Sequence, residues 1–268
     1  MKRGKKSLFV TVVAAFGLVS LSLVALPVLG MFAKTSLDEL VSLFADREVI
    51  SSILLTFETA VYATLFALIF GTPLAYALAR FDFPGRRFIE SLVSIPIIVP
   101  HTAAGIALLV VFASGPVGAF FASLGIDFMG TRAGIVLGMC FVSIPFYIDT
   151  VKEGFASIDD RIEHVARSLG ARQYQVFFRV MLPLAMRSVL AGSLLMWGRG
   201  ISEFGAVVIL AYHPMIAPVL IYERFTSFGL KSSRPVAVLL IIMCIIVFLI
   251  LRILSGIRVS RRARADRD

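Results

Sequence analysis

The chain has 268 residues, of which 59% are hydrophobic and 16% are charged, and its mean hydropathy is +0.93. A soluble domain carries about 25% charged residues, so this composition argues against a soluble protein and indicates a membrane protein. The formal net charge of +9 does not indicate a nucleic-acid-binding protein, because the basic residues are divided among the tails and loops between apolar runs.

Six apolar runs follow one another along the chain, and each is long enough to cross a bilayer, which takes about 20 residues. The first run is longer than the apolar region of a signal peptide, which has about 7–15 residues. Pro96 and Pro100 predict a kink or a break in the third run. Residues 114–132 fit either a re-entrant piece or a surface piece. The predicted spans are 8–32, 49–79, 88–113, 133–151, 182–211 and 235–257.

These runs predict an all-α integral membrane protein with a single six-helix domain at 8–257, an N-terminal segment at 1–7 and a basic tail at 258–268. Most Lys and Arg residues outside the spans fall on the side that would hold both termini, the 80–88 loop and the 152–181 loop. Cytoplasmic loops carry the excess of Lys and Arg. We therefore expect a multi-pass protein of the plasma membrane with both termini in the cytoplasm.

The cytoplasmic loop at 152–181 is too polar for lipid and too patterned for a plain connector. Ser157, Asp159 and Asp160 favour a helix start, and Gly170 favours a helix stop. Between them an apolar stripe recurs at helical spacing, formed by Ile162, Val165, Ala166 and Leu169. The other face carries Arg161, Glu163, His164 and Arg167, and the pattern alone leaves open whether that face is solvated or docks on a partner. A helix of about ten residues is marginal in water, so it must lean on the bundle or on a partner.

The stretch HVARSLGARQYQVFFRVMLPLAMRSVLAG resembles the EAA loop of ABC-importer permeases. Gly170 matches the glycine of that motif and Leu182–Pro183 matches its Leu-Pro, whereas His164 stands where the family has an acid, with Glu163 one residue earlier. The resemblance implies a type I ABC importer (MetI-like) permease fold in which this loop couples to a separate ATPase subunit, present in two copies. The implied coupling residues are Asp160, Arg161, Glu163, His164, Val165, Ala166, Arg167, Leu169, Gly170, Ala171 and Pro183.

Two further stretches, IPIIVPHTAAGIALLVVF and WGRGISEFGAVVILAYHPMIAPVLIYERF, resemble molybdate/tungstate permeases, and sulfate permeases share part of the pattern. Pro100–His101 stands where many relatives have Pro-Pro. The resemblance implies a pore made of two copies of the chain, fed by an extracytoplasmic molybdate/tungstate-binding protein. It implies contacts of the 212–234 connection with that protein, for which Tyr222, Glu223 and Arg224 are candidates; a plain surface loop is the alternative.

The chain has no Gly-x-x-x-x-Gly-Lys-Ser/Thr phosphate loop. It is therefore not expected to be an ATPase or to bind a cofactor, and ATP and Mg²⁺ would be bound by the partner subunit. The three histidines lie in three different segments, so no metal site is expected. The other function classes considered are a sulfate permease, an ATP-independent anion channel or secondary carrier, and an intramembrane enzyme, for which no catalytic constellation is present.

Charged residues at membrane depth are costly and usually face the bundle interior or water. Arg199 and Glu203 share one helix face, being four residues apart. They form either a self-neutralising structural pair or a lining of the anion path. Glu58 fits a contact between helices better than a gate. The candidate translocation path comprises Glu58, Pro96, Pro100, Arg199, Glu203 and Gly205.

Overall fold

The computed structural model describes the backbone of residues 3–265 and the side chains of residues 8–250, and within that range it contains helices and no strand. Four helices are long and apolar enough to span a membrane, and two bent helix pairs raise the number to six if each pair is one span. This confirms the all-α membrane fold predicted from the sequence. The four are Leu8–Ala33, Arg47–Arg80, Arg132–Ala156 and Leu230–Ile250.

The elements follow one another along the chain with short connections, and two of them, η1 and η2, are π-helical turns. They are α1 (Arg3–Ala33), α2 (Leu37–Leu43), α3 (Arg47–Phe66), η1 (Ala67–Gly71), α4 (Thr72–Arg80), α5 (Arg86–Ile98), α6 (His101–Phe112), α7 (Pro116–Ser123), α8 (Arg132–Ala156), α9 (Asp160–Ser168), α10 (Gln173–Val176), η2 (Phe177–Met181), α11 (Leu182–Leu184), α12 (Met186–Ile201), α13 (Gly205–Leu210), α14 (Ala217–Phe228) and α15 (Leu230–Ala265).

The second span is one continuous helix made of α3, η1 and α4, as the sequence predicts. The π turn η1 is followed directly by Thr72 and Pro73. A proline ring clashes with the carbonyl four residues before it and removes an N–H group. The π turn accommodates this by moving the hydrogen bond back one residue, so that the N–H of Thr72 donates to the carbonyl of Ala67. The same arrangement recurs at η2, which directly precedes Leu182–Pro183.

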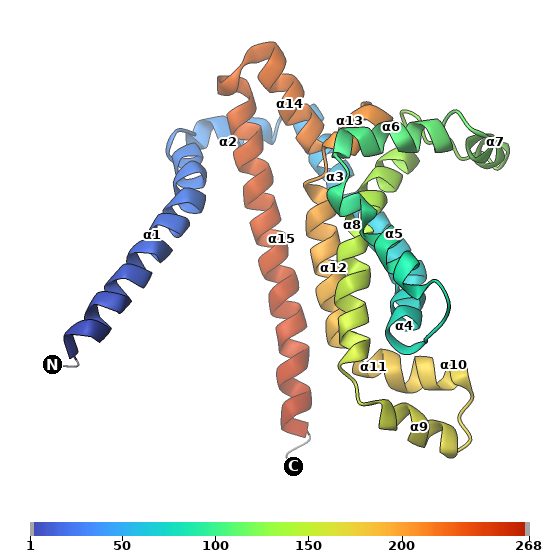
Figure 1. Cartoon of the computed structure of the whole chain (residues 1–268). Coiled ribbons are helices and arrows are strands. Elements are labelled where there is room, and N and C mark those ends of the chain that lie inside the picture. The colour runs from blue at the N-terminus through green and yellow to red at the C-terminus, as the bar shows by residue number, and fades with distance from the viewer. Residues whose placement is uncertain (1–2, 266–268) are drawn as a thin grey trace.

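The third predicted span is broken, as Pro96 and Pro100 indicate. Helices α5 and α6 are bent by 117° relative to each other, and Pro100 stands at the start of α6 without a side-chain cap. Helix α6 then runs across the end of the bundle instead of through it (Figure 1). Residues 88–113 are therefore not one straight span, and α7 follows α6 at the same end.

The fifth predicted span at 182–211 is wrong as a single helix. The segment Gln173–Leu184 is bent by 71° from α12, and α12 ends at Ile201 before α13 begins at Gly205. The carboxylate of Glu203 accepts the N–H of Ala206 at 2.9 Å and so starts a new helix. The polar connection expected at 212–234 contains α14, and helix α15, which includes the last span Leu230–Ile250, continues as a helix past residue 257 as far as Ala265.

The centre of the bundle is packed around Tyr147 of α8. A Cβ added to Gly71 or Gly192 would lie 3.0 or 3.3 Å from the Tyr147 ring. The Tyr147 hydroxyl is 2.6 Å from Thr72 Oγ1. Small residues of this kind let membrane helices approach closely, so α4, α8 and α12 form one tight unit.

The ends of the bundle differ. In Figure 1 the start of α1, the end of α15 and α9 lie toward one end, whereas α2, α6, α7, α13 and α14 lie at the other. The start of α1, the end of α15 and α9 thus share one end, whereas the assignment of that end to the cytoplasm stays a prediction; the side chains of residues 1–7 and 258–268 lie outside the described range. Helix α1 stands apart from the bundle, and no residue of its most apolar window is buried.

Candidate functional site

The loop at 152–181 contains a short capped helix, α9, which starts at the predicted Asp159–Asp160 and stops at the predicted Gly170, whereas Ser157 is the C-cap of α8. Asp159 is the N-cap and accepts the N–H of Arg161 at 2.9 Å. Gly170 has a φ of +88°, a left-handed conformation that glycine adopts without strain. The N–H groups of Gly170 and Ala171 donate to the carbonyls of Arg167 and Ala166, which is a Schellman motif.

A surface helix usually packs its apolar face on its own bundle, whereas α9 points its apolar face outward. Three residues of the apolar stripe point outward: Ile162 is 40% exposed, Val165 58% and Leu169 83%. Only Ala166 of the stripe is partly buried against the core. The buried residue is Glu163, which is 7% exposed, so the hypothesis of a uniformly solvated polar face is wrong for this residue.

Glu163 is buried because two groups, Tyr76 and Arg167, pair with its carboxylate. The Tyr76 hydroxyl donates to its Oε1 at 2.8 Å, and Arg167 lies at 3.0 Å from the same oxygen. Arg167 also donates to Gln173 at 2.8 Å. A buried carboxylate is tolerated when it is paired and hydrogen-bonded. The polar contacts therefore turn α9 so that its apolar stripe faces away from the bundle.

Arg80, at the end of α4, holds the turn that leads into α9. Its guanidinium donates to Asp160, to the carbonyl of Phe155 at 2.7 Å and to the carbonyl of Ile158 at 2.6 Å. The side chain is 5% exposed. The carbonyls at a helix C-terminus lack partners within the helix, and a cation satisfies them well.

Neither Tyr76 nor Arg80 was among the predicted site residues. In the sequence Arg80 has the position of an ordinary basic residue flanking a span, and no periodicity marks Tyr76. The one available signal is their spacing: they are four residues apart at the end of the second span that lies next to α9, and so share a face.

Most of the remaining coupling candidates form the outward surface of the loop, whereas Ala171 is partly buried against the core. Arg161 and His164 are exposed beside the apolar stripe. Pro183 lies at the end of the loop, directly after η2. His164 stands at the position of the family's acid and points away from the bundle side that holds Glu163.

A second cluster of charges lies where α12 ends and α6 begins. Glu203 is fully buried, and its Oε2 is 3.1 Å from both Arg199 Nη1 and His101 Nδ1. These are ion-pair distances, although neither contact has hydrogen-bond alignment. Arg199 Nη2 lies 3.0 Å from His101 Nε2. An unprotonated ring nitrogen at this position can accept a hydrogen bond from the guanidinium. The Arg199–Glu203 pair predicted from the sequence is thus present, and His101 completes it from another span.

The candidate path residues divide into two groups. Pro100 precedes His101, and a Cβ on Gly205 would lie 2.7 Å from the His101 Cβ, so these two residues belong to the Arg199–Glu203 cluster. Pro96 is buried one turn earlier in α5. Glu58 belongs to a different contact: it pairs with Arg132 at 3.2 Å and joins α3 to the start of α8.

A family model for the binding-protein-dependent transport system inner membrane component matches residues 63–264. The chain belongs to this family. It is a multi-pass membrane permease subunit of an ABC transporter.

Two relatives differ in the transport named for them. The molybdate/tungstate transport system permease protein WtpB of Pyrococcus abyssi (strain GE5 / Orsay) is 39% identical over 245 residues, 91% of this permease and 94% of the relative. The probable sulfate transport system permease protein cysT of Chlorokybus atmophyticus is 34% identical over 225 residues, 81% of this permease and 78% of the relative.

Solved structures confirm the type I importer fold. A bacterial alginate ABC transporter in complex with an alginate pentasaccharide-bound periplasmic protein contains a chain that is 19% identical, with a TM-score of 0.72 and coverage of 97% of both chains. The MetNI methionine ABC transporter in an inward-facing conformation contains one that is 14% identical, with a TM-score of 0.62 and coverage of 80% of this permease and 95% of that chain. At such identities the likeness concerns the fold alone.

In this permease the 212–234 connection is tied down at the end of the bundle opposite α9. Arg224 of α14 lies 2.6 Å from Asp46 and 3.1 Å from Glu48. Burial raises the pKa of Asp46, but the hydrogen bonds from Arg224 and from the N–H of Val49 outweigh it and hold that pKa below its usual value. Arg224 is therefore engaged within its own chain.

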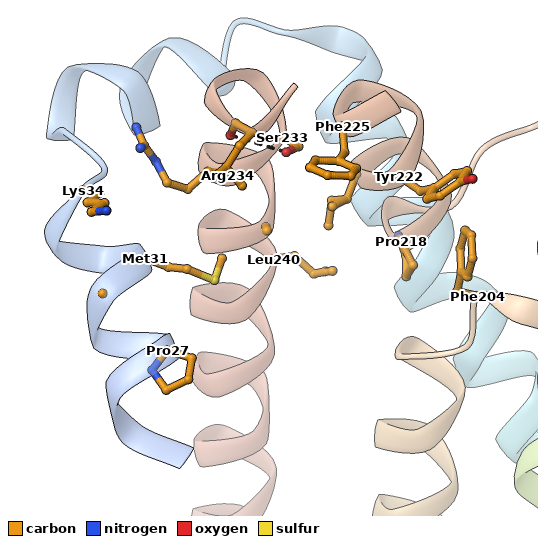
Figure 2. A pocket seen from close by; sticks show the side chains of 14 residues that line it. Pro27, Met31, Lys34, Phe204, Pro218, Tyr222, Phe225, Ser233, Arg234 and Leu240 are labelled. Atoms are coloured by element: carbon orange, nitrogen blue, oxygen red, sulfur yellow. Dashed lines mark hydrogen bonds between the residues drawn. The ribbon is translucent and has the colours of Figure 1, made fainter. Parts of the chain in front are cut away.

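Tyr222 and Glu223 have different surroundings. The Tyr222 ring packs on Phe204 with centroids 5.0 Å apart. It lines an apolar cavity of about 650 Å³ between α1, α14 and α15 (Figure 2). Glu223 accepts a hydrogen bond from the Tyr212 hydroxyl at 3.2 Å. Tyr222 is 47% exposed, and it remains the most accessible of the three candidate contacts.

Proposed function

We propose that this permease imports molybdate or tungstate into the cytoplasm. The observation that carries the proposal is the 39% identity to the molybdate/tungstate permease over 91% of this chain, against 34% over 81% for the sulfate permease. A sulfate permease is the second candidate. It is supported by the same fold and the same family, and it is weakened by the lower identity and shorter coverage.

The proposed transporter contains two copies of this chain, two ATPase subunits that bind ATP and Mg²⁺, and an extracytoplasmic oxyanion-binding protein. The outward apolar stripe of α9 supports an ATPase subunit as its partner, because exposed apolar surface beside a polar rim is typical of an interaction site. The chain itself would have no enzymatic activity. The position of α9 at the same end of the bundle as the start of α1 and the end of α15 (Figure 1) supports a plasma-membrane topology with both termini cytoplasmic.

We further propose that the Arg199–Glu203–His101 cluster lies at the outer end of the translocation path. It sits at the points where two membrane segments break, and Arg199 and His101 keep part of their surface accessible. Glu203 neutralises Arg199, which keeps a dianion from binding too tightly to leave. Binding-protein contact through Tyr222 and Glu223 is proposed on the same side of the bundle.

The experiment is uptake of radiolabelled molybdate into proteoliposomes that contain the assembled transporter and its binding protein. Uptake should require ATP and should be suppressed by excess tungstate but not by equal sulfate. Equal suppression by sulfate would support the sulfate permease instead. Uptake that persists without ATP and without the ATPase subunit would support the channel or carrier class and overturn the proposal.

A further inference from the structure

The coupling helix α9 is held by the second span as well as by the chain on either side of it. Covalently it continues from α8 and leads into α10, η2 and α12. The polar contacts that hold it to another span come from Tyr76 and Arg80 of α4. Because the apolar stripe faces outward, hydrophobic packing does little to hold α9 in place.

Arg80 fixes both ends of the turn between α8 and α9. One guanidinium nitrogen serves the carbonyls of Phe155 and Ile158, and another serves the carboxylate of Asp160. The planar guanidinium presents its donors in a rigid fork. A displacement of the first turn of α9 therefore pulls directly on the end of α4.

Tyr76 makes the second attachment, one turn earlier on the same face. Its hydroxyl reaches Glu163 in the middle of α9. Its ring packs at 5.2 Å from Phe155 of α8 and at 4.9 Å from Phe177 of η2. One buried side chain thus contacts α9 and the two arms that flank it.

From these contacts we infer that Tyr76 and Arg80 are positioning residues that transmit the movement of the coupling helix to the second span. The inference rests on the proposed function, since it requires an ATPase subunit docked on α9. It adds a non-covalent route to the covalent one through α8 and α12, and it assigns that route to two residues outside the EAA-like loop.

The far end of the second span contacts α14. The span has 34 residues, or about 50 Å of helix, and it starts beside Asp46. There Asp46 and Glu48 hold Arg224 of α14. A displacement delivered to α4 would therefore arrive at the connection that we propose faces the binding protein. Such a route needs a coupling measurement and not spatial continuity alone.

The test uses the assembled transporter with its binding protein and compares Tyr76→Phe and Arg80→Met with two matched controls. Tyr76→Phe removes one hydroxyl and keeps the ring. Tyr62→Phe is its control on the same span, at a half-exposed residue. Arg87→Met is the control for charge, because Arg87 lies in the same cytoplasmic region and forms no ion pair among the described residues.

The measured quantities are oxyanion uptake per ATP hydrolysed and the stimulation of ATPase by loaded binding protein. We expect Arg80→Met to lower the ratio by about tenfold and Tyr76→Phe by about threefold, with the controls unchanged and ATP hydrolysis itself retained. A merely structural role would lower the yield of complex and leave the ratio of the surviving complex unchanged.

An unchanged ratio in assembled Tyr76→Phe transporter overturns the inference, even if Arg80→Met fails to assemble. Arg80→Lys provides a second variant at that position, since it keeps the charge but loses the fork, and we expect an intermediate ratio. Absence of ATP-dependent uptake by the unsubstituted transporter would contradict the proposed function instead, so the two failures are distinguishable.

Discussion

Two glutamates are the buried acidic residues of the described part of the chain, and they have the same local design. Glu163 pairs with Arg167 four residues later and is reached by Tyr76 from another span. Glu203 pairs with Arg199 four residues earlier and is reached by His101 from another span. In both places an i, i+4 ion pair is joined by a polar group from a different helix.

The difference lies in what each carboxylate makes possible. At Glu163 the polar contacts face the bundle, so α9 presents its apolar stripe outward. At Glu203 the carboxylate neutralises a membrane arginine and accepts the N–H of Ala206, which starts α13. One pair therefore sets the direction of a surface helix, and the other stabilises a break between two helices.

The largest expected effect is a difference in the free energy of unfolding between Glu203→Gln and Glu163→Gln. Glu203→Gln leaves Arg199, whose side chain is 24% exposed, without its counter-charge, which should cost about 3 kcal/mol, the lower end of the range for a broken buried pair. Glu163→Gln keeps an acceptor for the Tyr76 hydroxyl, and Arg167 is partly exposed, so its cost should be below about 1.5 kcal/mol. Thermal unfolding of the detergent-solubilised permease checks the difference. Equal destabilisation by the two variants would contradict the comparison.

A double variant separates structure from transport at Glu203. Removing both charges, with Glu203→Gln and Arg199→Met, should restore much of the stability, because a neutral pair costs less than a lone buried charge. If Arg199 lines the anion path, as we propose, uptake should stay low in this stable variant. Recovery of uptake together with stability would reduce the cluster to a structural pair.

The second effect tests the outward stripe of α9. Leu169→Asp places a charge on a residue that is 83% exposed, so the stability of the isolated permease should change by less than about 0.5 kcal/mol. Association with the ATPase subunit should weaken by about 100-fold, since a charge would be buried at the interface without a partner. Co-purification and titration of the two subunits measure this loss. Leu124→Asp is the matched control, because Leu124 is 60% exposed at the opposite end of the bundle.

The start and stop of α9 could be predicted from the sequence because capping is local. Asp159 and Gly170 act on backbone groups within a few residues, so their chemistry is readable in the chain itself. The orientation of α9 could not be predicted in this way. It depends on Tyr76 and Arg80, which are about 80 residues away in sequence, and an apolar stripe has the same period whether it faces the core or a partner.

The breaks in the spans likewise divide into one that local sequence predicts and one that depends on tertiary contacts. The break in the third span was predictable because proline acts locally on the helix ladder; it occurs at Pro100, whereas Pro96 lies inside α5. The break after Ile201 has no proline and arises from the approach of His101 to Gly205 and from the capping by Glu203. The i, i+4 spacing predicted the Arg199–Glu203 pair, but the same spacing rule favoured a continuous helix across it. Contacts between distant segments, which no single segment reveals, determine that the helix breaks here instead of continuing.

The third effect concerns the stop of α9. Gly170→Val should uncouple ATP hydrolysis from uptake or prevent assembly, because a β-branched residue at φ +88° costs about 1–2 kcal/mol. Nothing lies within 4 Å of a Cβ at this position, so the cost comes from the backbone and not from crowding. Gly125→Val is the control, with φ +77° and equally open surroundings at the other end of the bundle. Uptake per ATP should fall in Gly170→Val alone, and an equal fall in both variants would point to general destabilisation.

The smallest effect adds a third acid, one at the surface. Asp46 caps α3 and pairs with Arg224. Asp46→Asn keeps the cap and loses the ion pair, whereas Asp46→Ala loses both, so the alanine variant should be less stable than the asparagine variant by about 1 kcal/mol.

Because the pKa of Asp46 is lowered in the folded state, its charge contributes stability above its unfolded pKa of about 4 and loses that contribution as the pH falls through the folded value. The difference in Tm between the unsubstituted permease and Asp46→Asn should therefore be constant from neutral pH down to about pH 5 and shrink in more acidic solution. A difference that grows on acidification would mean that the carboxylate is not held in its charged form by Arg224.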